Sequence, residues 1–337
     1  MNSASVTLDR TATVPPQAER PTLPWRRADV LGLQDWAPAE MEHVLDTAAS
    51  FKEIMARPIK KVPTLRGKSI VTLFYENSTR TRTSFELAAK VMSADAINIS
   101  ADASSVQKGE SLKDTILTLQ ALGMDLIVIR HPLSGAAAFA AQVARVPVIN
   151  AGDGTHEHPS QGLLDLFTLR EVKGHIEGLT VLIVGDITHS RVARSDLWGL
   201  RAMGARVRLC GPSTLMPSGI QAAGAEVYED LDEALPGVDV VNVLRIQQER
   251  QDRGLFPSLR EYSQRWGINP GRLRAAAPDV TVMHPGPMNR GVEISADVAD
   301  AGYAVITDQV QNGVAVRMAL LYLLLGALAD TTNGVGG

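Results

Sequence analysis

The stretch from Ser69 to Phe85, SIVTLFYENSTRTRTSF, contains the pattern that decides the fold. Its first part, Ser69 to Tyr75, is a short run of apolar and β-branched residues, which predicts a buried strand. Asn77 or Ser78 can cap the helix that follows, and we expect this helix to run to about Met92. A strand that leads directly into a helix is typical of a parallel sheet covered by helices.

The same alternation continues on both sides of this stretch. Apolar residues at helical spacing predict a helix from Glu40 to Met55. Downstream we expect strands over residues 96–99, 125–130 and 146–150, helices over 112–122 and 135–144, and a loop over 151–157. After a helix from about Pro159 to Val172, a second series of strands is expected over residues 180–185, 206–210, 225–228, 238–244 and 280–284. The pattern predicts an α/β protein with two doubly wound domains, each a mainly parallel sheet flanked by helices.

The domain boundaries follow from the same pattern. Residues 1–24 are rich in Ser, Thr, Pro and Ala without a continuous apolar block, so we interpret them as a disordered tail rather than a secretory signal. The first domain should span residues 25–158 and the second residues 159–309. A final helix, about Gly313 to Ala329, is apolar on most faces and should pack against another element.

Composition excludes several classes of protein. The 337 residues carry a formal net charge of −4, so the basic footprint of a nucleic-acid-binding protein is missing. No apolar run reaches the length of a membrane span, and we expect no membrane association. Cysteine occurs once, at Cys210, so no internal disulfide can form, which suits the cytoplasm.

The segment after the first strand has the composition of an anion site. Hydroxyl and guanidinium groups alternate at a predicted helix N-terminus, in the order Ser78, Thr79, Arg80, Thr81, Arg82. Free backbone N–H groups and the helix dipole favour an anion there, and arginine can bind phosphate in bidentate fashion. Other arginines also stand at the ends of apolar runs, which suggests one cationic pocket on a mildly acidic protein.

Nucleotide and metal sites are not supported. The turn at Val181 to Asp186 lacks the G-x-G-x-x-G of a dinucleotide fold, and Val62 stands where a P-loop before Gly67 needs its first glycine. His156, Glu157 and His158 lack further obvious ligands for a metal. We therefore expect no metal and no organic cofactor.

A family resemblance emerges from these motifs. The run from Ser78 to Arg82, after a strand ending in Phe-Tyr-Glu-Asn, resembles the carbamoyl phosphate signature of the aspartate and ornithine carbamoyltransferases. The resemblance covers roughly residues 30 to 330 and continues in order through Ala103–Glu110, Arg130–Pro132, His158–Gln161, Val184–Asp186, Arg245–Gln247 and His284–Pro287. It implies a transferase that carbamoylates the amine of aspartate, an early step of pyrimidine synthesis. It also implies that a C-terminal helix, about 310–331, packs back on the first, carbamoyl phosphate-binding domain, while residues 159–309 bind aspartate.

The resemblance assigns roles to particular residues. Those expected to bind carbamoyl phosphate are Ser78, Thr79, Arg80, Thr81, Ser104, Lys108, Arg130, His158, Gln161, Gly286 and Pro287. Those expected to bind aspartate are Lys108, Arg191, Arg245 and Gln247. The catalytic residues among them are Arg80, Thr81, Lys108, Arg130 and His158. Ser104 and Lys108 would reach into the neighbouring subunit's active site, which implies a homotrimer with shared sites.

The amine acceptor is the point at which alternatives stay open. Arg245-Ile246-Gln247 favours aspartate, whereas ornithine enzymes typically carry His-Cys-Leu-Pro where this chain has His284 to Pro287. Many relatives have Leu at the position of Gly286, but the contact expected there uses a backbone carbonyl. A transcarbamoylase for another amine and a non-catalytic anion-binding subunit of the same fold are the alternatives. The sequence does not tell whether regulatory or other pyrimidine-pathway chains join the trimer.

Overall fold

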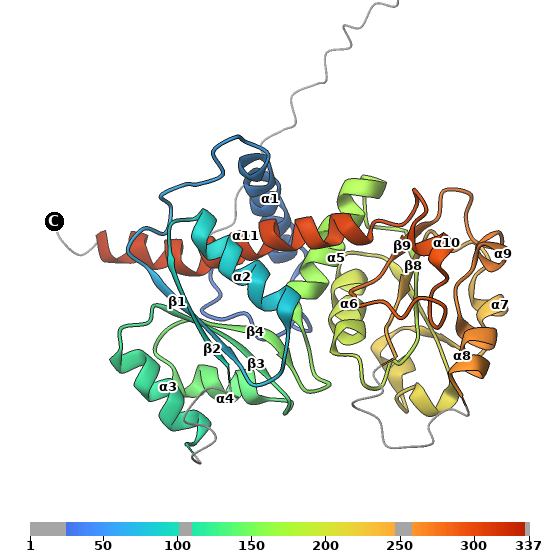
Figure 1. The fold of residues 1–337 in the computed structure, drawn as a ribbon, viewed down its shortest axis with the longest axis horizontal. Helices are drawn as coiled ribbons and strands as arrows, with labels where there is room; N and C mark the ends of the chain where they lie inside the picture. Colours follow the sequence, from blue (N-terminus) through green and yellow to red (C-terminus); the bar gives the residue numbers. More distant parts are fainter. Residues whose placement is uncertain (1–24, 101–109, 247–257, 334–337) are drawn as a thin grey trace, which may run out of the picture.

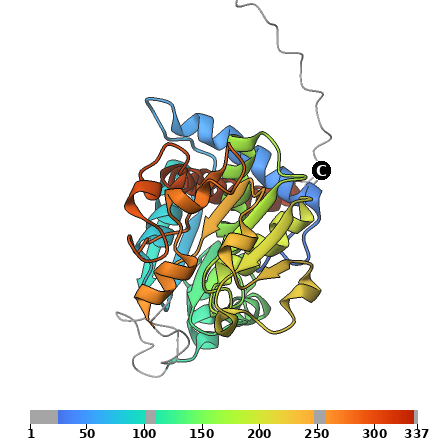
Figure 2. The same ribbon diagram turned by 90° about the vertical axis from the view of Figure 1, so that its right-hand side faces the viewer.

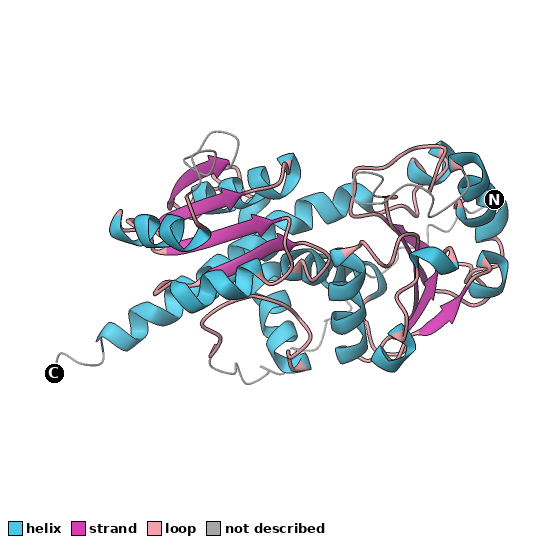
Figure 3. Ribbon diagram, turned by 90° about the horizontal axis from the view of Figure 1, so that it is seen from below, coloured by secondary structure: helices cyan, strands magenta, loops and turns pink. Residues whose placement is uncertain are grey.

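The computed structural model describes residues 25–100, 110–246 and 258–333. The strands form two separate parallel sheets, each surrounded by helices (Figures 1 and 3). One sheet has four strands in the order β2-β1-β3-β4, and the other has five in the order β7-β6-β5-β8-β9. The predicted fold class is therefore confirmed.

The first sheet is built from the strands nearest the quoted stretch. Its strands are β1 (Ser69–Phe74), β2 (Asp95–Ser100), β3 (Leu126–His131) and β4 (Val148–Asp153). The helices of this half are α1 (Pro38–Met55), α2 (Thr79–Val91), α3 (Leu112–Ala121) and α4 (Ala136–Val143). The prediction that residues 151–157 form only a loop was wrong, because β4 continues to Asp153, which pairs with His131 across a register shift.

The second sheet repeats the plan with shorter strands. They are β5 (Thr180–Val184), β6 (Arg206–Cys210), β7 (Glu226–Tyr228), β8 (Val240–Val243) and β9 (Thr281–Met283). The helical segments of this half are α5 (Pro159–Lys173), α6 (Arg191–Ala202), η3 (Ser213–Leu215), η4 (Ile220–Ala223), α7 (Leu231–Ala234), α8 (Leu259–Trp266), α9 (Pro270–Leu273) and α10 (Ala296–Ala299). Figure 2 views this half end-on, with the strands between the helices.

The last helix, α11 (Ile306–Asn333), joins the two halves. It packs against α1, α2 and α5, and in Figure 1 it crosses from the second sheet back over the first. It begins before the predicted Gly313. The polar residues Gln309 and Asn312 interrupt the apolar pattern there, but both are buried and donate hydrogen bonds from their NH2 groups to α5. In the described part of the chain, no helix is both long and apolar enough to cross a membrane.

The strand orders locate the functional edge of each sheet. In the first sheet β2 lies on one side of β1, and the chain then crosses to β3 on the other side, so the order reverses between β1 and β3. In the second sheet the reversal lies between β5 and β8. Ligands of open α/β sheets bind beyond the carboxyl ends of strands at such points. The segments after β1, β3, β5 and β8 are therefore the places to look for a site.

Candidate active site

One cavity of about 770 Å³ lies where these segments meet. Residues that follow β1 and Arg130 near the end of β3 line one side, and residues that follow β5 and β8 line the other. The predicted site residues that line it are Ser78, Thr79, Arg80, Thr81, Arg130, His158, Gln161, Arg191, Arg245, Gly286 and Pro287. Ser104, Lys108 and Gln247 lie outside the described residues.

The N-terminus of α2 forms the first side of the cavity. Ser78 is the N-cap residue by position, with an extended backbone (φ −153°, ψ 97°), but its side chain makes no capping hydrogen bond with the helix. The predicted cap position is therefore confirmed at Ser78, without a capping hydrogen bond from its side chain. The backbone N–H groups of the first turn have no helical acceptor, so they and the hydroxyl groups of this turn are suited to bind an anion.

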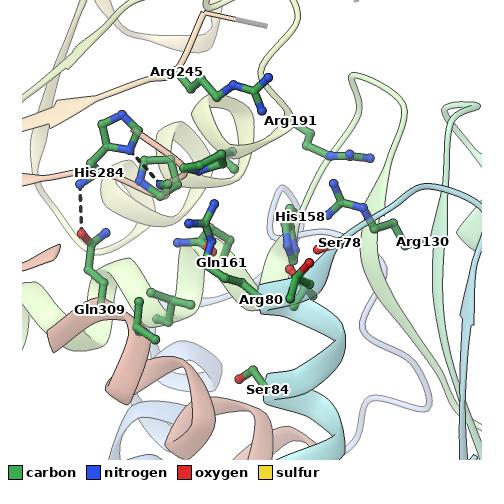
Figure 4. Close-up of a pocket in the computed structure, with 18 of the residues that line it drawn as sticks. Ser78, Arg80, Ser84, Arg130, His158, Gln161, Arg191, Arg245, His284 and Gln309 are labelled. Carbon is green, nitrogen blue, oxygen red and sulfur yellow. Dashed lines mark hydrogen bonds between the residues drawn. The ribbon is translucent and has the colours of Figure 1, made fainter. Parts of the chain in front are cut away.

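A single carboxylate links arginines from the two halves. Glu76 follows β1, and its Oε2 lies 3.3 Å from Nε of Arg130 at the end of β3. The same oxygen accepts a hydrogen bond from Nη2 of Arg191, the first residue of α6. Figure 4 shows the Arg130 and Arg191 side chains turned toward one another. An anion that binds these arginines must compete with Glu76.

Helix α5 carries His158 and Gln161 into the cavity from between the two sheets. His158 is the N-cap residue of α5, and its backbone N–H donates to Oγ of Ser195 at 2.9 Å. Both side chains are buried, with relative exposures of 3% for His158 and 8% for Gln161. The positive end of the helix dipole favours developing negative charge beside His158, and burial strengthens this interaction.

Positive charge dominates the second side of the cavity. Arg191 and Arg245 extend from positions just after β5 and β8 (Figure 4). Burial, and then repulsion from Arg245, lower the pKa of the Arg80 guanidinium. An anion placed between these arginines would relieve the repulsion, so the cavity favours anionic ligands.

A turn after β9 closes the cavity. Gly286 has φ +63°, and a Cβ atom built there would lie 2.7 Å from Nη1 of Arg80. His284 holds the turn, because its Nδ1 accepts a hydrogen bond from the Gly286 N–H at 2.8 Å while Nε2 lies 3.3 Å from Oε1 of Glu293. Burial lowers the pKa of His284, which favours the neutral ring that this pattern requires. Glycine at 286 thus leaves room for the Arg80 side chain.

Several cavity residues received no site role from the sequence, although some of them lie within the quoted motifs. They are Glu76, Asn77, Ser84, Leu164, Ser190, Val192, Leu244, His284, Pro285, Ile306, Gln309, Val310 and Arg317. Glu76 lay in the quoted stretch, and its carboxylate beside a basic turn was the available signal. Gln309 and Arg317 interrupt the apolar pattern of α11, and polar side chains in a buried helix need partners.

The His156–His158 segment is engaged in protein contacts. Nδ1 of His156 lies 3.1 Å from Oδ1 of Asp153, and Oε2 of Glu157 accepts from the Leu33 N–H and from Oγ of Ser195, each at 2.8 Å. Among the residues that the structure describes, no cluster of His, Cys, Asp and Glu is suited to hold a metal ion.

Comparison with known proteins identifies the class to which this fold and cavity belong. Residues 28–171 match the family model of the aspartate/ornithine carbamoyltransferase carbamoyl-P binding domain. Residues 177–324 match the model of the Asp/Orn binding domain of the same enzymes. The chain therefore belongs to the aspartate/ornithine carbamoyltransferase family, as its motifs predict.

Individual members of the family are similar to this chain over most of its length. The aspartate carbamoyltransferase catalytic subunit of Heliobacterium modesticaldum is 63% identical over 302 residues, which cover 90% of this chain and 97% of that protein. The aspartate transcarbamoylase of Trypanosoma cruzi, solved in complex with carbamoyl phosphate and aspartate, has a TM-score of 0.80 at 31% identity and covers 88% of this chain and 96% of its own. The ornithine carbamoyltransferase of Pyrococcus furiosus has a TM-score of 0.79 at 30% identity, with coverage of 90% and 98%.

Proposed function

We propose that this chain transfers the carbamoyl group of carbamoyl phosphate to the amine of L-aspartate, giving N-carbamoyl-L-aspartate and phosphate. The observation that carries the proposal is one cavity in which the N-terminus of α2 faces arginines from the second sheet. Such a cavity can hold a phosphate beside a dicarboxylate. The 63% identity to an aspartate carbamoyltransferase catalytic subunit supports aspartate as the acceptor.

The phosphate of carbamoyl phosphate would bind at the first side of the cavity. The N–H groups and hydroxyls of Ser78, Thr79 and Thr81 supply short donors, and the Arg80 guanidinium supplies charge. Arg130 would donate to a phosphate oxygen and to the carbonyl oxygen, after exchanging Glu76 for the substrate. The backbone of Gly286 and Pro287 would contact the carbamoyl group from the opposite wall. Ser104 and Lys108, which lie outside the described residues, are proposed to bind carbamoyl phosphate as well.

The two carboxylates of aspartate would bind at the second side. Arg191 and Arg245 each offer a planar pair of donors that matches a carboxylate. Gln247 and Lys108, both outside the described residues, are proposed to join them. Binding at this side places the amine of aspartate next to the carbamoyl carbon.

The chemistry then requires position and charge stabilisation rather than a covalent enzyme intermediate. Carbamoyl phosphate binds first, and the neutral amine attacks its carbonyl carbon. Thr81, Arg130 and His158 stabilise the oxyanion of the tetrahedral intermediate, and the departing phosphate can accept the amine proton. Proximity and electrostatic preorganisation together can lower the barrier by about 10 kcal/mol. Closure of the two halves around the substrates would exclude water.

The assembly and the domain roles belong to the same proposal. We infer a homotrimer in which Ser104 and Lys108 serve the neighbouring subunit's site. Residues 25–158 with the C-terminal helix would bind carbamoyl phosphate, and residues 159–309 would bind aspartate. The cytoplasm remains the predicted location, on the basis of the single cysteine.

A product assay tests the reaction. Purified protein mixed with carbamoyl phosphate and one amine should form carbamoyl aspartate from aspartate and little product from ornithine. Preferential carbamoylation of ornithine would assign the chain to the other branch of the family. Phosphate binding without carbamoylation of either amine would support a non-catalytic subunit.

Subunit mixing tests the shared site. Arg80→Ala and Lys108→Ala proteins should each be inactive, and mixed trimers should regain partial activity because some sites then hold both native residues. Mass measured in solution verifies that mixed trimers have formed. Verified mixed trimers that stay inactive would contradict the shared site.

A further inference from the structure

A buried pair of carboxyl groups lies directly behind the cavity. Asp165 of α5 and Asp196 of α6 have relative exposures of 3% and 1%. Together with Asn242 and Met283 they line a small internal pocket between α5 and the second sheet. Neither aspartate lines the active-site cavity, and the mechanism proposed above does not use them.

The orientation of the Gln309 amide can be deduced from a backbone donor. The His284 N–H donates to Oε1 of Gln309 at 2.9 Å, as the dashed line in Figure 4 shows. A backbone N–H is always a donor, so the oxygen of Gln309 must face it. The NH2 group of Gln309 therefore faces Asp165, where Nε2 lies 2.7 Å from Oδ1. Oδ1 of Asp165 must act as an acceptor.

The same acceptor then fixes the orientation of Gln161. Nε2 of Gln161 lies 3.1 Å from Oδ1 of Asp165, with both groups buried. Since Oδ1 only accepts, Gln161 must present its NH2 group to Asp165. The amide oxygen of Gln161 is then the atom left for the cavity that this residue lines.

The other end of the pair shows why Oδ1 stays an acceptor. Asp196 accepts a hydrogen bond from Nδ2 of Asn242 at 2.8 Å, and the two aspartates are in hydrogen-bonding contact with each other. Two carboxylates that are buried and in contact cannot both ionise, so the pair shares one proton between Asp165 and Asp196. Burial, and then the charge of Asp165, raise the pKa of Asp196 well above its ordinary value. The buried Arg317 guanidinium balances the remaining negative charge.

We propose that Asp165 is a positioning residue, which turns the amide oxygen of Gln161 toward the cavity and thereby selects an acyl phosphate that carries an NH2 group. The proposal rests on the function proposed above, in which Gln161 contacts the carbamoyl group. An NH2 group donates to the oriented oxygen, whereas a methyl group at the same place leaves that buried oxygen unpaired. Carbamoyl phosphate should therefore bind better than acetyl phosphate, which has the same shape.

Two substitutions of Asp165 separate this role from a purely structural one. Asp165→Asn keeps an oxygen for both glutamines and can donate its NH2 group to Asp196, so orientation and net charge are preserved. Asp165→Leu has a similar size but no acceptor, so Gln161 loses its fixed orientation. The experiment compares the KM for carbamoyl phosphate with the inhibition constant of acetyl phosphate in wild type and both variants.

The account predicts a selective effect. Asp165→Leu should raise the KM for carbamoyl phosphate by about 10-fold or more, the scale of a lost buried hydrogen bond. The inhibition constant of acetyl phosphate should change by less than about 3-fold in that variant, and Asp165→Asn should stay within about 3-fold of wild type for both compounds. If Asp165→Leu does not fold, Asp165→Ser, whose hydroxyl is too short to reach both glutamines, replaces it.

The contrary results are equally specific. Equal weakening of both compounds in Asp165→Leu, or the same selective loss in Asp165→Asn, would overturn the positioning role. If wild-type protein carbamoylates aspartate but the Asp165→Leu variant keeps the native preference for carbamoyl phosphate over acetyl phosphate, this inference is wrong and the proposed function is unaffected. Wild-type protein that binds both acyl phosphates equally, or forms no carbamoyl aspartate, would reject the assignment of Gln161 itself.

Discussion

The two sides of the cavity hold their arginines in different ways. On the first side, most of the anion site is one continuous turn, Ser78 to Thr81, whose backbone donors are set by the start of α2, and Arg130 joins it from β3. On the second side, Arg191 and Arg245 are far apart in sequence and meet only because β5 and β8 are neighbours in the sheet. Donors on the first side are thus local and rigid, whereas those on the second are long side chains that tertiary structure brings together. We expect the first side to govern the chemistry and the second to govern the choice of amine.

Removing the charge of the first side should have the largest effect. Arg80→Ala should lower kcat by roughly two to four orders of magnitude, because the charge on the departing phosphate loses its guanidinium partner. The scale follows by analogy with the loss of one oxyanion donor, which costs about 10²–10³. The KM for aspartate should change much less, and steady-state kinetics measures both. Arg82→Ala, a neighbour on α2 that does not line the cavity, is the control and should remain near wild type. Near-native turnover of Arg80→Ala would refute the phosphate assignment.

Removing a guanidinium from the second side should have a smaller and different effect. Arg245→Ala should raise the KM for aspartate about 100-fold, since a charge-assisted bidentate pair with a carboxylate is lost. Binding of inorganic phosphate, measured by calorimetry, should weaken by less than about 3-fold. The exposed Arg206 supplies the control, Arg206→Ala, with an unchanged KM. An Arg245→Ala protein with native aspartate KM would remove this residue from the amine site.

A methyl group placed between the two sides should have an intermediate effect. Gly286→Ala puts a Cβ atom 2.7 Å from Nη1 of Arg80 and strains a backbone with φ +63°. We expect kcat/KM for carbamoyl phosphate to fall about 10-fold because of the contact with Arg80. Backbone strain should separately lower the free energy of unfolding by about 1–2 kcal/mol.

A matched control separates strain from contact with Arg80. Gly291 also has a positive φ, +84°, but a Cβ atom there meets nothing within 4 Å. Gly291→Ala should therefore lose stability with little change in kcat/KM. Equal activity losses in the two variants would show that contact with Arg80 is not the cause.

The smallest predicted effect concerns pH and stability. Burial raises the pKa of Asp165 to about 7 and that of Asp196 well above 3.8, so the folded pair keeps a proton that the unfolded chain releases above about pH 4. The free energy of unfolding should therefore fall as the pH rises from 4 to 7. The Asp196→Asn variant lacks this shared proton. Its free energy of unfolding should therefore fall less steeply over this pH range than that of wild type, by on the order of 1 kcal/mol per pH unit.

Chemical denaturation at several pH values measures this difference. Asp279→Asn is a control of opposite sign, because the hydrogen bond from Lys173 lowers the pKa of the exposed Asp279 carboxyl. Its contribution is present above the ordinary pKa of aspartate and is lost as the pH falls. Parallel stability curves for wild type and Asp196→Asn would contradict the shared proton.

Sequence reasoning predicted the parts of the fold that depend on local pattern. The two parallel sheets and the turn at Ser78 to Thr81 followed from short apolar runs, a helix start and a known family signature. The cavity brings the described members of the predicted site together, although their individual roles remain predictions. Residues 101–109 and 247–257, which contain Ser104, Lys108 and Gln247, stand outside the structure's description.

The parts that were missed depend on tertiary contacts. The early start of α11 was hidden because Gln309 and Asn312 look like surface residues until α5 supplies their partners. Glu76 could not be recognised as a bridge between Arg130 and Arg191 before the two sheets were placed side by side. The Asp165–Asp196 pair gives no periodic signal, since each residue alone interrupts an apolar helix face.

The central claim is that phosphate and dicarboxylate bind at opposite sides of one cavity. The most direct test is calorimetric binding of N-(phosphonacetyl)-L-aspartate, which joins a phosphonate to both carboxylates in one molecule. We predict one site per chain, and affinity at least about 100-fold weaker in both Arg80→Ala and Arg245→Ala, while inorganic phosphate is weakened only by Arg80→Ala. Equal weakening of inorganic phosphate by both substitutions, or native affinity for the joined ligand in Arg245→Ala, would contradict the account.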